Sequence, residues 1–269
     1  MDKGKVFRDL HHAGGAFILP NPWDIGTAKL LASAGFNALA TTSAGYAFSR
    51  GLPDGGIGFE EMIDHCRDIV AATDLPVSAD LEKGKGDSPE SAAETIFAAE
   101  AAGLAGCSIE DHTGDPGKPI YDFSHAVERV AAAVEAARAL KRDFVFTARA
   151  ENFLWGRADI DDTIKRLQAF EQAGADVLYA PGLNDVETVT TICSAVSRPV
   201  NVLAVPAFTV HALAEVGVRR ISLGSKLTTF AFGMLETASR EMLHDGTFGF
   251  TRAGMAFDRA QALFSKPGK

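Results

Sequence analysis

The stretch Ala101-Ala-Gly-Leu-Ala-Gly-Cys-Ser-Ile-Glu-Asp111 contains the pattern on which the fold prediction depends. A helical pattern ends at Gly103, a short apolar strand follows, and this strand runs directly into two carboxylates. Glycine suits the position after a helix because it adopts the left-handed conformation without a Cβ clash. The same order of helix, glycine and strand recurs at Ser33-Ala-Gly-Phe36, Gln172-Ala-Gly-Ala175 and Glu215-Val-Gly-Val218.

Helical patterns that alternate with short apolar strands predict a parallel sheet. We expect strands at residues 17–19, 38–42, 77–81, 107–110, 144–148, 177–179, 200–203 and 221–223. Helical patterns between them include residues 88–102, 123–140, 160–173 and 185–194. This arrangement predicts a (β/α)8 TIM barrel, with an open doubly wound sheet as the alternative. A dinucleotide-binding fold is disfavoured because no Gly-x-Gly-x-x-Gly motif follows the first strand.

The length of 269 residues favours one domain, so we expect residues 1–269 to form a single barrel. Two amphipathic helical patterns, at residues 228–243 and 252–264, follow the last predicted strand. One helix is enough to close a barrel. Residues 228–269 are therefore predicted to be a C-terminal helical extension, which caps the barrel or packs on a partner subunit.

The net charge of −9 argues against nucleic acid or an anionic membrane as the main partner. Three scattered cysteines, Cys66, Cys107 and Cys193, favour a reduced protein over a disulfide scaffold. No apolar stretch approaches the roughly 20 residues that span a bilayer, and no signal peptide pattern follows Met1. These features predict a cytoplasmic protein.

Charged side chains follow three of the predicted strands. Asp80 and Glu82 end one strand and Glu110 ends the next, while Asp54 lies in a glycine-rich loop. Parallel-sheet enzymes build their sites at these strand ends, and hard oxygen ligands suit Mg²⁺. We therefore predict that these four carboxylates bind Mg²⁺, with Mn²⁺ also possible. The structural alternative is that Asp80 caps a helix and the others are solvated loop charges.

Arg149 follows the apolar run Phe144-Val-Phe146, which leaves little room for the alternative of a surface ion pair. A guanidinium matches the geometry of a carboxylate, so we predict that Arg149 binds a substrate carboxylate. Glu151 and Asn152 are expected to orient it.

Small residues after the second predicted strand favour an anion-binding loop of backbone N–H groups. The predicted substrate contacts in this loop are Thr42, Ser43, Ala44, Gly45 and Tyr46. The glycine-rich segments 83–86 and 112–119 are predicted either to close over the site or to be ordinary solvated turns.

Together these segments resemble the isocitrate lyase/phosphoenolpyruvate mutase superfamily. The resemblance extends from Pro20-Asn-Pro-Trp-Asp24 to Arg220-Ile-Ser-Leu-Gly224. Between these ends lie Thr42-Ser-Ala-Gly45, Leu52-Pro-Asp54, Asp80-Leu-Glu-Lys-Gly-Lys-Gly86, Ile109-Glu-Asp111, Thr147-Ala-Arg149 and Pro199-Val-Asn201.

The resemblance implies a Mg²⁺-binding (β/α)8 barrel that acts on small 2-oxo acids or their precursors. It also implies a homo-oligomer, a dimer of dimers, in which a C-terminal helix is exchanged between subunits. By position, Asp80 resembles the carboxylate nearest the metal, and the carboxylates that hold its waters correspond to Asp54, Glu82 and Glu110. Asp54 and Glu110 are also candidate catalytic residues, and Arg149 and Asn201 resemble the substrate-carboxylate contacts.

Departures from the family pattern concern the loop after Asp111. Isocitrate and methylisocitrate lyases carry Lys-Lys-Cys-Gly-His there, whereas no cysteine occurs between Asp111 and Tyr121. The phosphonate mutases use a Lys and an Asn, and only Lys118 is available here. Glu82 also replaces the more usual Asp. The resemblance is thus to the carboxyphosphonoenolpyruvate mutase-like branch.

The resulting expectation is a Mg²⁺-dependent lyase that cleaves a C–C bond beside a small 2-oxo or 2-hydroxy carboxylate, through a metal-stabilised enolate. Such chemistry resembles an oxaloacetate decarboxylase, or a 2-methylisocitrate lyase without its Cys acid. One alternative is a phosphoenolpyruvate/phosphonopyruvate mutase or a phosphonopyruvate hydrolase acting on a P–C bond. Another is a catalytically inactive relative retained for binding.

Overall fold

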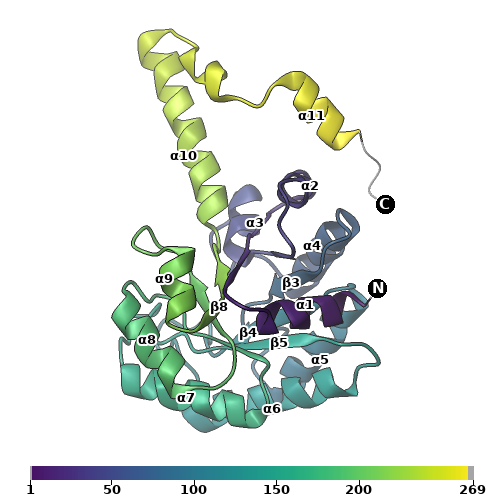
Figure 1. Cartoon of the computed structure of the whole chain (residues 1–269), viewed down its shortest axis with the longest axis vertical. Helices are drawn as coiled ribbons and strands as arrows, with labels where there is room; N and C mark the ends of the chain where they lie inside the picture. Colours follow the sequence, from purple (N-terminus) through teal and green to yellow (C-terminus); the bar gives the residue numbers. More distant parts are fainter. Residues whose placement is uncertain (1, 266–269) are drawn as a thin grey trace.

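Eight parallel strands form a nearly closed barrel in the computed structural model, which describes residues 2–265 (Figure 1). The strands are hydrogen-bonded in the order β1-β8-β7-β6-β5-β4-β3-β2. Between β1 and β2, the Ala40 amide donates to the Pro20 carbonyl at 3.0 Å. The predicted (β/α)8 barrel is therefore confirmed. The strands are β1 (Phe17–Leu19), β2 (Leu39–Ala40), β3 (Val77–Asp80), β4 (Gly106–Glu110), β5 (Val145–Arg149), β6 (Val177–Tyr179), β7 (Val200–Leu203) and β8 (Val218–Ser222).

Helices precede, separate and follow the strands. The helix patterns predicted between strands agree with the structure to within two residues. The Ser88 side chain caps the helix that starts at Pro89, and Gly174 ends another helix at φ 104°, in the left-handed region. The α-helices are α1 (Lys3–His12), α2 (Ile25–Ser33), α3 (Ser43–Ser49), α4 (Phe59–Ala71), α5 (Pro89–Ala101), α6 (Phe123–Ala139), α7 (Ile160–Ala173), α8 (Val186–Ala195), α9 (Val210–Glu215), α10 (Lys226–Arg240) and α11 (Phe257–Phe264).

Two apolar clusters hold the barrel together. The larger lies between the strands and the surrounding helices and includes the buried Phe146 and Phe170. The smaller lies inside the barrel, where Phe7 of α1 packs with Leu19, Val145 and other strand residues. Because α1 fills the amino-terminal end of the barrel, the opposite end, where the strands finish, is left for polar side chains.

The structure differs locally from the predictions. The second strand is Leu39–Ala40, not residues 38–42, and the last helix begins at Phe257, not at residue 252. The last strand is Val218–Ser222, not residues 221–223, because it begins directly after the left-handed Gly217. Helix α1 was not predicted, although Asp2 caps it. The segment from Ser43, predicted as an anion-binding loop, is helix α3, which Thr42 caps by accepting from the Gly45 amide.

The C-terminal segment projects from the barrel. Helix α10 extends away from the strands, and the chain then turns through η1 (Glu241–Asp245) and η2 (Gly249–Ala253) into α11 (Figure 1). Large apolar side chains on this arm, residues 226–264, lie in solvent in the single chain; Phe230, Leu235 and Leu243 are 67, 64 and 82% exposed. Within residues 2–265, no helix is long and apolar enough to cross a membrane.

Candidate active site

The carboxyl ends of adjacent strands bring the predicted charged residues together. Asp80 is the last residue of β3, and Glu110 and Arg149 are the last residues of β4 and β5. Glu110 and Arg149 are register partners in the sheet. Side chains from successive parallel strand ends share one face, so the three groups line the same end of the barrel interior.

Arg149 lies among carboxylates. Its Nη1 is 2.6 Å from Asp80 Oδ1, and its Nη2 is 2.9 Å from both Glu110 Oε2 and Glu151 Oε1. The side chain is 11% exposed, so these ion pairs are largely shielded from water. The predicted orienting role of Glu151 agrees with this contact. Asn152 instead donates to Asp162, and its own Oδ1 is buried without a partner in the described chain.

Helix α3 fixes the second oxygen of Asp80. The Ser43 hydroxyl and backbone amide donate to Asp80 Oδ2 at 2.9 and 3.3 Å. A carboxylate at a helix N-terminus is stabilised by the exposed amides and by the helix dipole. Asp80 is thus held from two sides: its contact with the first residue of α3 resembles the helix cap of the structural alternative, whereas its ion pair with Arg149 goes beyond that role.

We call Asp54, Asp80, Glu82 and Glu110 the carboxylate cup. Burial and mutual repulsion disfavour four negative charges in this cup. Burial and the charges of Asp80, Glu110 and Asp54 raise the pKa of Glu82 to about 8. The pKa of Asp54 is also raised, by desolvation and by Asp80 and Glu110. Glu82 has φ 49°, a left-handed conformation that is costly for a residue with a Cβ. Strain and like charge in one place are typical of functional sites.

This donor set fits a hard divalent cation, although the described residues contain no group of three or more Asp, Glu, His or Cys in position to hold an ion jointly. Mg²⁺ commonly takes only one or two protein carboxylates and keeps several waters. One direct carboxylate, Asp80, with further carboxylates near it, fits that requirement. A cation would also relieve the repulsion that raises the pKa of Glu82 and Asp54.

Asn201 lies lower in the barrel, where it is 1% exposed. Its Oδ1 accepts from Arg220 Nε at 2.9 Å, and its Nδ2 donates to the Ser222 hydroxyl at 2.9 Å. Arg220 also donates to Thr147 Oγ1 at 3.0 Å and lies 3.3 Å from His11 Nε2. Asn201 is therefore part of a buried polar network beneath the carboxylates, and its predicted substrate contact stays a prediction.

The other residues of the predicted anion-binding segment have structural partners. The Tyr46 ring stacks on His65 with centroids 3.8 Å apart, and its hydroxyl donates to Glu61. Gly45 allows a close helix contact, because a Cβ there would lie 2.5 Å from Thr228 Oγ1. Only Ser43 of the segment contacts a charged residue of the site, and Ala44 lies beside it, partly buried.

Two aromatic residues at the site were missed from the sequence. Arg149 lies over the Tyr179 ring, 5.3 Å from its centroid, and Trp155 stacks on His112 with centroids 3.8 Å apart. His112 Nδ1 is in turn 3.6 Å from Glu110 Oε1. Tyr179 ends β6, so its position at a strand end was the available signal. Nothing in the sequence indicated Trp155, which comes from the loop after β5.

The two glycine-rich loops contact each other. Lys83 Nζ donates to the Thr113 carbonyl at 2.8 Å, and the Tyr121 hydroxyl donates to Asp87 at 2.6 Å. Within the second loop, His112 pairs with Ile120 in an antiparallel bridge. The loops therefore form one connected rim beside Glu110, at the edge of the site.

A (β/α)8 barrel with carboxylates and an arginine at the carboxyl ends of its strands has the architecture of a barrel enzyme. The family model described as phosphoenolpyruvate phosphomutase matches residues 7–243. The chain belongs to this family, within the phosphoenolpyruvate mutase/isocitrate lyase superfamily. The predicted resemblance is confirmed.

Curated and solved relatives agree with this assignment. A probable 2-methylisocitrate lyase of Corynebacterium glutamicum is 30% identical over 243 residues, which cover 85% of this chain and 76% of the relative. A structure from Burkholderia cenocepacia J2315, named as a lyase/mutase, is 53% identical with a TM-score of 0.96, covering 98% of this chain and 96% of the other.

More distant solved structures share the fold. Oxaloacetate acetylhydrolase with bound oxalate is 26% identical with a TM-score of 0.86, covering 97% of this chain and 93% of the other. The structure of phosphonopyruvate hydrolase with oxalate and Mg²⁺ has a TM-score of 0.87, and the match covers 98% of this chain and 95% of the other. At 22% identity, this last likeness shows the fold alone.

Proposed function

We propose that the protein is a Mg²⁺-dependent lyase that cleaves a C–C bond beside a small 2-oxo or 2-hydroxy carboxylate. The observation that carries the proposal is the pairing of the Arg149 guanidinium with Asp80 and Glu110 at the strand ends, with Glu82 and Asp54 near enough for these charges to raise their pKa values. Burial and like charge raise the pKa of Glu82 to about 8, so the cup favours a cation. The 2-methylisocitrate lyase and oxaloacetate acetylhydrolase relatives support C–C chemistry.

In this proposal Asp80 binds the cation, and the water ligands are held by Asp54, Glu82 and Glu110. The bound cation would supply a Lewis acid for the oxygen on which negative charge develops. Arg149 carries the positive charge that grips a substrate carboxylate, and it can exchange its contacts with Asp80 and Glu110 for that group. Glu151, 1% exposed, keeps the guanidinium in place during the exchange.

Turnover with and without a chelator tests the proposal. Purified protein is incubated with oxaloacetate and methylmalate-type acids, with Mg²⁺ or with EDTA, and products are followed by chromatography. We expect turnover of at least one acid that stops with EDTA and returns with added Mg²⁺. Absence of metal-dependent turnover of every acid in the series would count against the lyase.

Cleavage or rearrangement of a P–C bond is the second candidate, favoured by the match to the phosphoenolpyruvate phosphomutase model. Phosphorus NMR of a mixture with phosphonopyruvate distinguishes the two. An unchanged phosphonate signal excludes this class, whereas a new phosphate ester or free phosphate signal identifies a mutase or a hydrolase.

We also propose that the C-terminal arm packs on a second copy of the chain. Its large apolar side chains are exposed in the single chain, with Phe230 at 67% and Leu235 at 64%, and water contact at so many of them is unfavourable. Covering them with the same arm of another subunit would give a closed homo-oligomer. This arrangement agrees with the helix exchange implied by the family resemblance.

A further inference from the structure

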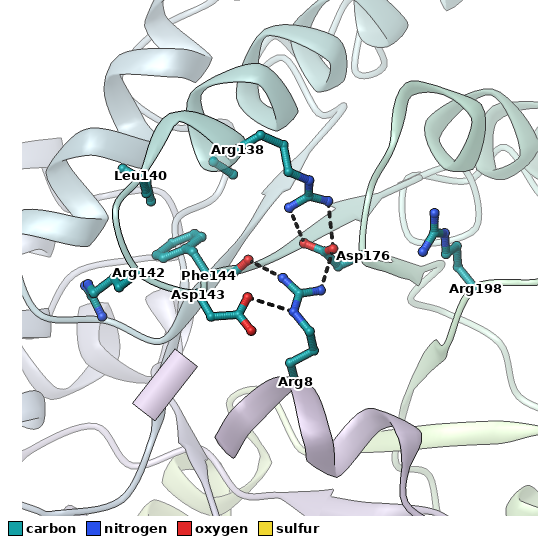
Figure 2. Close-up of a pocket in the computed structure, with 9 residues that line it drawn as sticks. Arg8, Arg138, Leu140, Arg142, Asp143, Phe144, Asp176 and Arg198 are labelled. Carbon is teal, nitrogen blue, oxygen red and sulfur yellow. Dashed lines mark hydrogen bonds and ion pairs between the residues drawn. The ribbon is translucent and has the colours of Figure 1, made fainter. Parts of the chain in front are cut away.

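A polar cavity of about 420 Å³ lies at the amino-terminal end of the barrel, opposite the candidate active site (Figure 2). Its charged lining comes from separate elements. Arg8 belongs to α1 and Arg138 to the last turn of α6, and Asp143, Asp176 and Arg198 lie one or two residues before β5, β6 and β7. Because strand starts and helix ends converge here, the cavity is part of the barrel frame.

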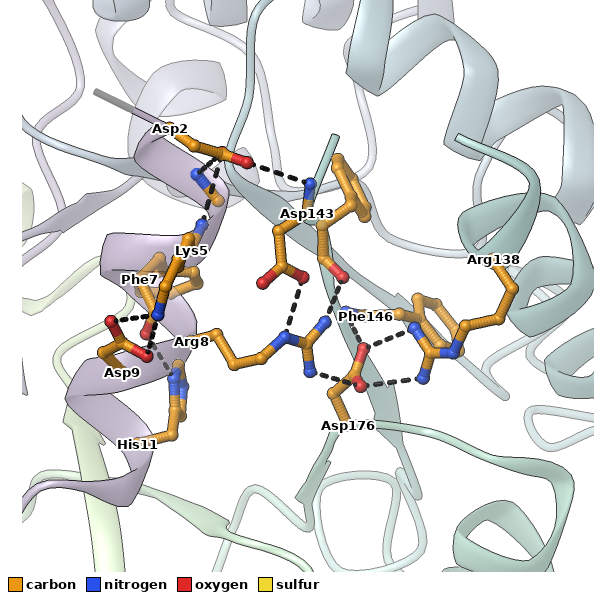
Figure 3. Close-up of polar contacts among 12 residues, drawn as sticks. Asp2, Lys5, Phe7, Arg8, Asp9, His11, Arg138, Asp143, Phe146 and Asp176 are labelled. Atoms are coloured by element: carbon orange, nitrogen blue, oxygen red, sulfur yellow. Dashed lines mark hydrogen bonds and ion pairs between the residues drawn. The ribbon is translucent and has the colours of Figure 1, made fainter. Parts of the chain in front are cut away.

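Asp176 is the centre of the charged network (Figure 3). Its carboxylate is 5% exposed and accepts from Arg8 Nη1 at 2.7 Å, from Arg138 Nη2 at 2.7 Å and from the Phe146 amide at 2.9 Å. Arg8 Nε also pairs with Asp143 at 2.7 Å. The Asp176 carboxylate thus accepts from two guanidinium groups and a backbone amide, which leaves little room for another donor.

Among the residues that line the cavity, arginines outnumber carboxylates. Arg8, Arg138 and Arg198 face Asp143 and Asp176, while the fourth arginine, Arg142, is paired with Glu100 at 2.8 Å. Within residues 2–265, Arg198 makes no hydrogen bond or ion pair, and in Figure 2 no dashed line joins its side chain to the other lining residues. The positively charged lining of this cavity contrasts with the net charge of −9 of the whole chain.

Unused donors remain on all three arginines. A guanidinium has five N–H donors, and Arg8 and Arg138 each make three hydrogen bonds to the surrounding protein. Arg198 adds a complete guanidinium. Donors that reach one cavity from different sides suit a phosphoryl group, which offers at least three acceptor oxygens and up to two charges, better than a single carboxylate.

We propose that this amino-terminal cavity is a binding site for a small phosphorylated anion. The volume is near the lower end of the range for ligand pockets, which fits a phosphate ester of a few carbons or inorganic phosphate. A bound phosphoryl group would join α1, α6 and the segment before β7, and so stabilise the folded barrel by binding. This proposal does not depend on the reaction catalysed at the opposite end.

Calorimetric titration with phosphate tests the site, because its readout requires no turnover. Inorganic phosphate, pyrophosphate and glycerol phosphate are titrated separately into the full chain in EDTA, and the melting temperature is measured with and without each. We expect one site per chain and a rise in melting temperature. Preference among the three probes distinguishes free phosphate from a phosphate ester.

Variants locate the binding. Arg198→Glu should weaken phosphate binding by at least about tenfold, the loss expected for a charge-assisted hydrogen bond, and Arg198→Ala should weaken it less. Arg198 is exposed and unpaired in the described chain, so both variants should fold. Arg67→Ala, which removes an arginine from the exposed face of α4, should leave binding unchanged.

Three results would overturn the proposal. These are no binding of any probe, equal binding by wild type and Arg198→Glu, or loss of binding in Arg149→Lys, which would place the phosphate in the active site. Tighter binding of succinate or of a short acidic peptide than of every phosphate probe, with the same dependence on Arg198, would assign the cavity to carboxylates instead.

Discussion

At the residue scale, the site depends on one guanidinium among several carboxylates. The sequence identified Arg149, Asp80, Glu82 and Glu110 because each follows an apolar strand. The structure brings Asp80, Glu110 and Arg149 into contact, and Glu82 lies near enough for Asp80 and Glu110 to raise its pKa. The sequence did not show that Arg149 is fully occupied by Asp80, Glu110 and Glu151 in the single chain. Such contacts depend on the register of adjacent strands, which a sequence does not display.

Arg149→Lys is expected to reduce kcat/KM by about a hundredfold or more. Lysine keeps the charge but loses the planar fork that can hold a carboxylate by two parallel bonds. Steady-state kinetics on the acid identified by the turnover screen measures the change. Arg67→Lys, on the exposed face of α4, is the matched control and should retain wild-type kinetics. A similar loss in both variants would contradict a specific role for Arg149.

A second residue-scale prediction concerns pH and stability. Burial, followed by the charge of Arg220, lowers the pKa of His11 from 6.5 to about 3. In the unfolded chain His11 therefore binds a proton near pH 6.5, whereas in the folded chain it does so only near pH 3. Between these values stability must fall as the pH falls, by between 1 and 2 kcal/mol per pH unit from this group.

Denaturant unfolding at pH 7, 6 and 5 measures this slope. His11→Gln should flatten it by the His11 contribution, whereas His12→Gln should not, because His12 is exposed. Equal slopes for wild type and His11→Gln would show that His11 is not held neutral by the fold.

At the element scale, the sequence predicted the alternation of strands and helices well and the irregular parts poorly. Strand cores and capped helices follow local rules, such as the glycine after a helix and Pro89 at a helix start. Helix α3 was predicted as a loop because its small residues have no apolar period. Its helical form depends on packing against α10 and on the Ser43 contact with Asp80.

Gly45→Ala tests the packing of α3 on α10. A Cβ at this position would lie 2.5 Å from Thr228 Oγ1 and 2.6 Å from Thr42 Cγ2, so these side chains or the helices that carry them must shift. We expect a loss of about 1–3 kcal/mol in the free energy of unfolding. Chemical denaturation measures it, with Gly14→Ala as the control because no atom lies within 4 Å of a Cβ there. Equal stability of the two variants would mean that α3 and α10 are not tightly packed.

At the scale of the whole molecule, one chain forms the whole barrel, whereas the C-terminal arm leaves apolar side chains uncovered. The sequence predicted an extension but could not show which of its faces stays uncovered. In the structure α10 reaches out from the barrel and carries apolar side chains into solvent (Figure 1). The uncovered face is the physical reason to expect a homo-oligomer.

The double variant Phe230→Glu/Leu235→Glu should shift the protein toward smaller species. Charged side chains at these exposed positions, 67% and 64% in the single chain, cannot be buried against a second arm without a partner charge. Light scattering coupled to size-exclusion chromatography measures the mass. Phe97→Glu, at a 49% exposed apolar position on α5, is the control. An unchanged mass for the double variant would place the subunit contacts elsewhere.

The central claim is that the strand-end carboxylates and Arg149 form a Mg²⁺-dependent site for a small carboxylate. A crystal structure of the protein grown with Mg²⁺ and oxalate tests it most directly. We predict Mg²⁺ beside Asp80, with waters held by the neighbouring carboxylates and oxalate in contact with Arg149. Well-ordered strand ends with neither ion present at saturating concentrations, or oxalate bound elsewhere, would contradict the claim.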